Sequence, residues 1–153
     1  MVDPAGIPSI VVVGTDGSST AQRAVARAAA LCAALNARLV VVSAYNNRAP
    51  GGAAATGIAT DASFVMAQLT TAETVAEAAV EAARVAGVTD IVARAEAGEP
   101  AESLLRVVNE LGADLLVVGS KGMQSTARFL SGPIANKVSK KVSCDLLIVE
   151  TSD

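Results

Sequence analysis

Short apolar runs alternate with amphipathic segments along most of the chain, and turn-forming residues separate them. The first run, 10–14 (IVVVG), is continuous and β-branched. Such a run indicates a strand that is buried on both faces, as in a parallel sheet. Similar apolar runs at 39–44, 91–95, 115–118 and 146–149 predict four further strands.

Between these runs, apolar side chains recur at helical spacing. The pattern predicts helices over 21–35, 64–86, 100–111 and 134–141. Strict alternation of strands and helices is typical of an open parallel α/β sheet with right-handed crossovers. Because no repeat or linker interrupts the alternation, we expect residues 1–153 to form a single domain.

A glycine-rich loop, 119–132 (GSKGMQSTARFLSG), follows the fourth predicted strand. Gly119, Gly122 and Gly132 allow backbone N–H groups to approach a ligand closely, and the helix start that follows supplies free donors. Such a loop suits a phosphate, whereas the alternative is an ordinary connection between a strand and a helix. It is not a Walker A loop, because the chain has no G-x-x-x-x-G-K-[ST] pattern.

A second loop, 14–18 (GTDGS), follows the first strand. Its Asp16 can accept a hydrogen bond from a ribose hydroxyl or a base amino group, or it can simply cap a turn. Ligands of open α/β sheets bind at the carboxyl ends of the strands, so we expect both loops at one site if strand one lies beside strand four. Ala44 is small enough to admit an adenine ring, and Lys121 can reach a phosphate; each can also be an ordinary surface residue.

The amino-acid composition argues against several kinds of function. The chain has 153 residues, 52% of them hydrophobic, a formal net charge of −3 and no His. This charge gives no electrostatic case for nucleic acid, and no apolar run approaches the roughly 20 residues that span a bilayer. Without His, a Ser-His-Asp triad and His metal ligands are excluded, and we predict no catalytic and no metal-binding residue. Cys32 and Cys144 are expected to be buried thiols of a cytoplasmic protein.

Five segments together resemble the universal stress protein family over essentially the full chain. They are IVVVGTDGSSTAQRAV, LVVVSAY, GEPAESLL, DLLVVGSKG and GPIANKVSKKVSCDLLIVE. The nucleotide-binding branch of this family is similar in its G-x2-G-x9-G-[ST] pattern, which here is completed by Pro133 where Ser or Thr is expected. The resemblance implies an adenine nucleotide alpha hydrolase-like fold, with a five-stranded parallel sheet of order 3-2-1-4-5 and helices on both faces.

The resemblance also implies roles for single residues. Thr15 and Asp16 would contact adenine and ribose, Ala44 would lie against the base, and the loop glycines would wrap the phosphates. The predicted nucleotide-binding residues are Thr15, Asp16, Ala44, Gly119, Lys121, Gly122, Gly132, Pro133 and Ile134. The ligand would be ATP, alone or with Mg²⁺, or another adenine nucleotide such as AMP or cyclic AMP. The partner would be a second copy of the chain, in a homodimer formed through the last strand by Leu146, Leu147, Ile148 and Val149.

Pro133 is the departure from the family pattern, because it removes a hydroxyl and a backbone N–H from the predicted phosphate site. A hydrogen bond to a charged group is worth roughly 1.5–3 kcal/mol, so the loss of these donors weakens phosphate binding. A single phosphate needs fewer donors from this loop than a triphosphate does. The sequence thus predicts a stress-response protein that binds an adenine nucleotide and acts as a homodimer. The alternatives are a dimeric stress protein that binds no nucleotide and acts through protein–protein interaction, and a slow ATPase.

Overall fold

A five-stranded parallel sheet with the order β3-β2-β1-β4-β5 forms the centre of the fold. The computed structural model describes residues 6–47, 60–120 and 132–151. The strands are β1 (Ile10–Gly14), β2 (Arg38–Tyr45), β3 (Ile91–Ala97), β4 (Leu115–Gly119) and β5 (Asp145–Val149). The expected parallel sheet and its order are confirmed.

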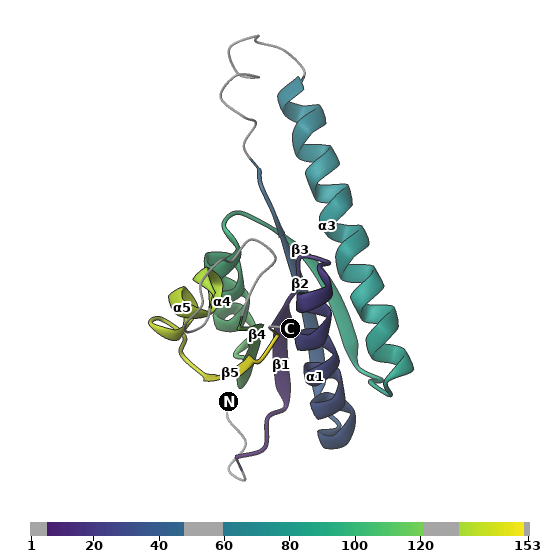
Figure 1. Cartoon of the computed structure of the whole chain (residues 1–153), viewed down its shortest axis with the longest axis vertical. Coiled ribbons are helices and arrows are strands. Elements are labelled where there is room, and N and C mark those ends of the chain that lie inside the picture. Colours follow the sequence, from purple (N-terminus) through teal and green to yellow (C-terminus); the bar gives the residue numbers. More distant parts are fainter. Residues whose placement is uncertain (1–5, 48–59, 121–131, 152–153) are drawn as a thin grey trace.

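Helices cover both faces of the sheet, as expected. In the described part of the chain they are α1 (Ser19–Leu35), α3 (Thr60–Val85), α4 (Pro100–Leu111) and α5 (Pro133–Ser139). Figure 1 shows α1 and α3 on one side of the sheet and α4 and α5 on the other. The helix predicted over 134–141 ends earlier, at Ser139, and α3 begins before its expected start because its first turn is polar and carries no apolar period.

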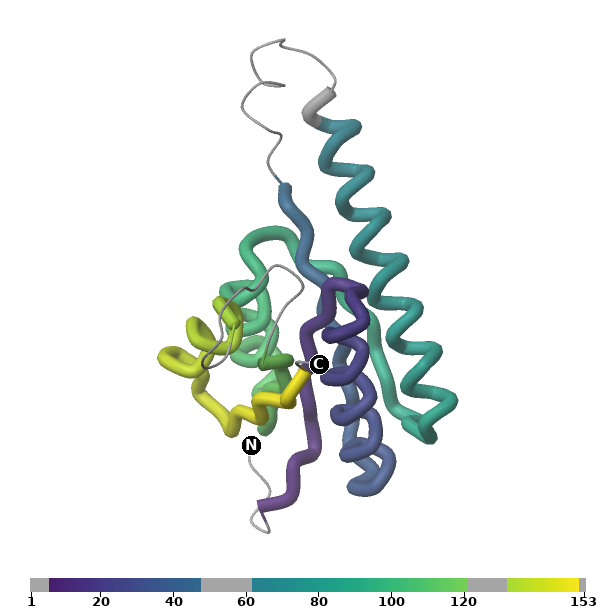
Figure 2. The backbone as a smooth tube through the Cα atoms, in the orientation of Figure 1, coloured from purple at the N-terminus to yellow at the C-terminus, as the bar shows by residue number. Residues whose placement is uncertain are grey.

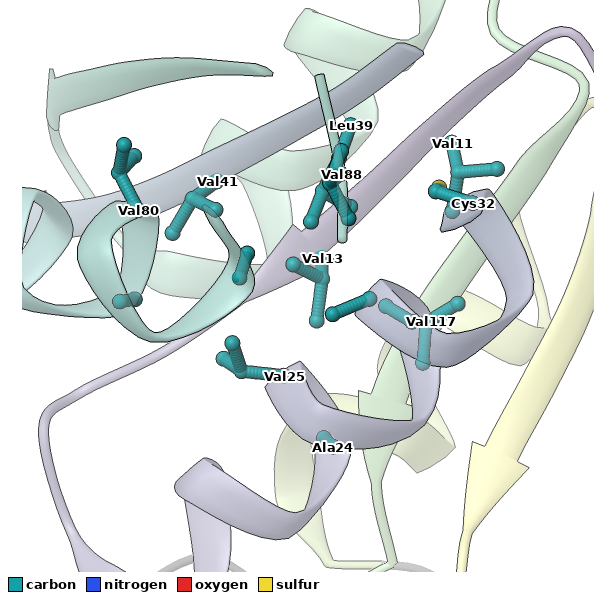
Figure 3. Packing of buried hydrophobic residues seen from close by; sticks show 14 of the residues in the cluster. Val11, Val13, Ala24, Val25, Cys32, Leu39, Val41, Val80, Val88 and Val117 are labelled. Atoms are coloured by element: carbon teal, nitrogen blue, oxygen red, sulfur yellow. The ribbon is translucent and has the colours of Figure 1, made fainter. Parts of the chain in front are cut away.

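The face under α1 and α3 buries an aliphatic cluster made from alternate strand residues. Val11, Val13 and Val117 project from the two central strands and are fully buried. Figure 3 shows Val13 and Val117 facing α1, the helix that carries Ala24. Since Ala24 and Ala28 have the smallest side chains beyond glycine, α1 lies close to the sheet, and a bulky residue at either position would overpack the core.

The opposite face packs against α4 and α5 with the intervening strand residues. Val12, Leu116 and Val138 are fully buried there, together with Leu104 of α4. A Cβ on Gly14 would lie 3.0 Å from the Cδ1 atom of Leu104, so α4 sits tightly against the end of β1. The central strands therefore supply two cores, which is why they are apolar without alternation.

One buried carboxylate holds the amino edge of the sheet. Asp114, which is 6% exposed, accepts three hydrogen bonds at Oδ2: from Ser9 N at 2.9 Å, Ser9 Oγ at 2.8 Å and Ile10 N at 2.9 Å. Burial alone would raise the pKa of this carboxyl, but these hydrogen bonds outweigh it and hold the pKa below its ordinary value. The start of β1 is thereby tied to the start of β4.

Both cysteines are free thiols. Cys32 is buried, as expected, and burial raises its pKa to about 11. The prediction of a buried thiol is wrong for Cys144, which is only partly buried because it lies in the short turn between α5 and β5. Across the described residues, no helix has both the length and the apolar character needed to cross a membrane.

Candidate functional site at the carboxyl edge of the sheet

The two glycine-rich loops leave the same edge of the sheet from neighbouring strands. β1 pairs in parallel with β4, and Val13 lies opposite Val117. The adjacency of strands one and four is therefore confirmed, and the chain path in Figure 2 shows both strands ending on one side. Lys121 and Gly122, two of the predicted phosphate contacts, lie outside the described residues.

The loop after β1 is a tight turn held by its own side chains. Thr15 N donates to Val42 O at 2.9 Å, which extends the pairing with β2. Thr15 Oγ1 accepts from Gly17 N at 3.1 Å, and Asp16 Oδ1 accepts from Ser18 N at 2.9 Å. Gly17 has a φ of +83°, a conformation that side chains strongly disfavour. Both Thr15 and Asp16 are thus fixed at the rim of the sheet.

Asp16 keeps capacity for a ligand while it shapes this turn. Its side chain is exposed, and the cap of α1 is provided by Ser18, whose Oγ accepts from Ala21 N at 3.1 Å. An ionised carboxylate offers about four acceptor positions, and the turn uses one of them at Oδ1. The capping role and the ligand role considered for Asp16 are therefore compatible.

The loop after β4 is anchored by the last residue of β5 and by Thr151, which follows that strand. Ser120 N donates to Val149 O at 2.7 Å, and Ser120 Oγ accepts from Thr151 N at 3.0 Å. Gly132 N donates to the carbonyl oxygen of Ser120, which joins the two ends of the loop. Thr151 is fully buried, and a Cβ on Gly119 would lie 3.1 Å from its Cγ2 atom. This close approach explains glycine at position 119.

Helix α5 begins directly where the loop closes. Gly132 is its N-cap residue in an extended conformation and provides no side-chain cap, and Pro133 follows in the first turn. The first N–H groups of a helix have no acceptor within the helix. Pro133 has no N–H, so Ile134 and Ala135 supply the remaining first-turn donors at this point of the loop.

A cleft of about 610 Å³ opens at the same edge of the sheet, where β2 and β3 end. Its lining residues come from the end of β2, the turn after β3 and the start of α4: Ala44, Tyr45, Asn46, Asn47, Gly98, Glu99, Pro100 and Glu102. Ala44, predicted to lie against the base, is therefore part of a cavity wall. The hydrogen bond between Thr15 N and Val42 O places the β1 loop on the adjacent strand, just before this wall.

Two carboxylates and one ammonium group lie at the α4 side of the cleft. Glu99 caps α4 by accepting from Ala101 N at 3.3 Å and from Glu102 N at 3.1 Å. Lys137 Nζ of α5 lies 3.0 Å from Glu99 Oε2 and 3.5 Å from Glu102 Oε1. Partial burial would raise the pKa of Glu99, but Lys137 and the two backbone donors lower it overall, and hydrogen bonding to Glu99 raises the pKa of Lys137.

Sequence reasoning missed this cluster, which we call the Glu99–Lys137–Glu102 cluster. The only available signal was an acidic residue immediately before Pro100. In the described residues, no group of three or more His, Cys, Asp or Glu side chains has an arrangement that could hold a metal ion.

The last strand lies at an edge of the sheet and pairs with β4 on its inner side. Of the residues predicted to form a dimer interface, Ile148 is 38% exposed. Leu146, Leu147 and Val149 pack against the cores of their own chain. Among these four, Ile148 is the side chain best placed to meet a second molecule.

The parallel sheet and its paired loops place the chain in the adenine nucleotide alpha hydrolase-like fold. The model of the Universal stress protein family matches residues 9–150. Over 142 residues the chain is 37% identical to universal stress protein Rv1636 of Mycobacterium tuberculosis, and the match covers 93% of this chain and 96% of that protein. The chain therefore belongs to the universal stress protein family.

Solved structures show the same architecture. The crystal structure of a universal stress protein in complex with cAMP has a TM-score of 0.70 and 36% identity, and the match covers 95% of this chain and 99% of that one. UspA from Lactobacillus plantarum has a TM-score of 0.80 at 18% identity and covers 92% of this chain and 97% of its own. The latter likeness shows the fold alone.

Proposed function

We propose that this protein binds an adenine nucleotide with a single phosphate, such as cyclic AMP or AMP, at the carboxyl edge of β1 and β4. The observation that carries the proposal is the direct pairing of these strands, which starts both glycine-rich loops at one place. Open α/β sheets bind their ligands at such a switch point. The ligand class is supported by the 36% identical universal stress protein that was solved in complex with cAMP.

Each part of the ligand has a suitable place. The base lies against Ala44 in the cleft, and Asp16 accepts a hydrogen bond from the ribose. Thr15 holds the turn between them. The phosphate lies at the loop between Gly119 and Gly132, where Ile134 adds a backbone donor; Lys121 and Gly122 complete the predicted set.

Pro133 favours a monophosphate over ATP. Without an N–H or a hydroxyl at this position, the start of α5 has fewer donors to share among several phosphates. Turnover of ATP is at most slow, because the chain has no His to serve as a general base. The protein therefore acts through ligand-dependent interaction and not as an efficient enzyme.

The interacting unit is a homodimer that pairs the β5 edges of two copies. An exposed strand edge is a template for pairing, and a symmetric dimer covers both edges at once. The variant Ile148→Lys places a charge at the most exposed of the predicted interface positions. Light scattering should show a dimer for the wild type and a monomer for this variant, with unchanged circular dichroism as evidence of folding.

Calorimetric titration of the purified protein with cyclic AMP, AMP and ATP tests the proposed ligand. We expect saturable binding of the two monophosphates and weaker binding of ATP. Absence of binding for all three would overturn the proposal. It would then favour the alternative that Pro133 also suggests, a dimeric stress protein that binds no nucleotide and acts through protein–protein contacts.

A further inference from the structure

The cleft at the end of β2 and β3 differs in chemistry from the phosphate loop. Its lining contains two carboxylates, two amides and a phenol, and none of its lining residues is Lys or Arg. Lys137 lies beside the two carboxylates and offsets one of their charges, so the cluster keeps a net negative charge, which disfavours a phosphate and suits a neutral group that donates hydrogen bonds. This chemistry supports an orientation of the proposed nucleotide in which the phosphate lies toward α5 and the base toward the cleft.

The lining of the cleft suits a flat ring. Ala44 and Pro100 offer a short and a rigid side chain, Gly98 has none, and Tyr45 adds an aromatic group. Gly98 N donates to Tyr45 O at 2.9 Å, which fixes the turn after β3 against the end of β2. This wall is thus built before a ligand arrives, as in most small-molecule sites.

The two carboxylates at the cleft differ in how many hydrogen bonds and ion pairs they already make within the protein. Glu99 already accepts from two backbone N–H groups and from Lys137 at 3.0 Å, and so it holds the start of α4. Glu102 has a longer contact with Lys137, at 3.5 Å, and its side chain is 61% exposed. Glu102 is therefore the cleft carboxylate with acceptor capacity for a ligand.

We infer, on the basis of the proposed nucleotide site, that Glu102 determines base specificity by accepting a hydrogen bond from the exocyclic amino group of adenine. An ionised carboxylate only accepts hydrogen bonds. Hypoxanthine carries an oxo group where adenine carries its 6-amino group, so its oxygen would face the carboxylate without a proton between them. Sites that hydrogen-bond one substituent reject the analogue that cannot supply it.

Titration of the wild type with cyclic AMP and with cyclic inosine monophosphate tests this inference, because the two ligands differ at one substituent of the base. We expect the wild type to prefer cyclic AMP by about tenfold or more. In Glu102→Gln the side-chain amide can donate as well as accept, so the preference should fall below about threefold. Glu110→Gln is the matched control: Glu110 lies on the same helix but pairs with Arg94 at 3.0 Å and does not line the cleft.

The outcomes separate this inference from the proposed function. If both ligands bind the wild type equally, or if Glu102→Gln keeps the full preference, the role of Glu102 is overturned while the nucleotide site stands. If Glu110→Gln loses the preference as Glu102→Gln does, the effect is one of general charge and the role is again overturned. If neither ligand binds, the proposed function itself fails and the inference fails with it.

Discussion

Two aspartates lie at opposite edges of the same central strand pair, and the fold uses them differently. Asp114 precedes β4 at the amino edge, is buried, and accepts three hydrogen bonds from the start of β1 at one oxygen. Asp16 follows β1 at the carboxyl edge, is exposed, and accepts one hydrogen bond from its own turn. The oxygen of Asp114 that its hydrogen bonds leave unused, Oδ1, is buried, so an acidic residue next to a strand indicates function only when a ligand can reach an unused acceptor position.

The amino and carboxyl edges of the sheet differ in the same way as the two aspartates. At the amino edge, backbone and side-chain groups of β1 and β4 are joined to each other through Asp114. The carboxyl edge has a cleft, a helix start without a side-chain cap, and glycines at the positions of closest approach. The amino edge stabilises the sheet, and we assign the proposed ligand site to the carboxyl edge.

The largest effect should follow from Asp114→Ala. This change leaves the N–H groups of Ser9 and Ile10 without their shared acceptor, so the free energy of unfolding should fall by about 2–4 kcal/mol. Urea unfolding followed by circular dichroism measures the loss. A decrease below about 0.5 kcal/mol would contradict the structural role of this carboxylate.

The same residue should give a pH signature. Because the folded chain lowers the pKa of Asp114 below its ordinary value of 3.8, its carboxylate stabilises the fold fully above that pH. This contribution is lost as the pH falls through the lower, folded-state pKa. Asp114→Asn keeps the shape but cannot ionise, so the stability difference between wild type and variant should be constant near neutral pH and shrink in acid. A difference that grows in acid would refute this assignment.

At the opposite edge, Asp16→Ala should affect binding and not stability. We expect the free energy of unfolding to change by no more than about 1 kcal/mol, because the side chain is exposed and makes one turn hydrogen bond. The affinity for cyclic AMP should fall about tenfold with the loss of a charged acceptor for the ribose. Asp16→Asn, which keeps the turn oxygen, is the control and should lose less. Equal affinity in all three proteins would remove Asp16 from the site.

The smallest effect is expected for Pro133→Ser. It restores a backbone N–H and a hydroxyl at the start of α5, so ATP affinity should rise several-fold, up to about tenfold. Affinity for cyclic AMP should change less, since one phosphate needs fewer donors. Calorimetry on both ligands measures the ratio, and an unchanged ATP affinity would count against a phosphate at this loop.

The helices and strands could be predicted because short sequence patterns specify each of them. The β-branched runs at 10–14 and 115–118, each followed by glycine, specify strands buried on both faces. Periodicity does not specify which strands are neighbours, since this depends on how the helices cross over. The order β3-β2-β1-β4-β5 was implied by the family resemblance and is confirmed by the pairing of β1 with β4.

Of the candidate site, the sequence predicts only the positions that single strand ends define. Asp16 and Ala44 follow directly from the ends of the first two strands. The Glu99–Lys137–Glu102 cluster could not be predicted, because its residues lie 35 and 38 positions apart and meet only when α4 packs beside α5. Asp114 was missed for a similar reason: its partners are 104 and 105 positions away, so it looks like any aspartate before a strand.

A cyclic AMP titration of ¹⁵N-labelled protein, followed by amide chemical shifts, tests most directly whether the loops after β1 and β4 form one nucleotide site. If both loops bind one nucleotide, the amides of Thr15 and Asp16 after β1, and of Gly132 and Ile134 after β4, should respond together with one dissociation constant. The amide of Asp114 at the far edge should not move. A response confined to one of the two loops, or shifts that centre on the amino edge, would contradict a shared nucleotide site.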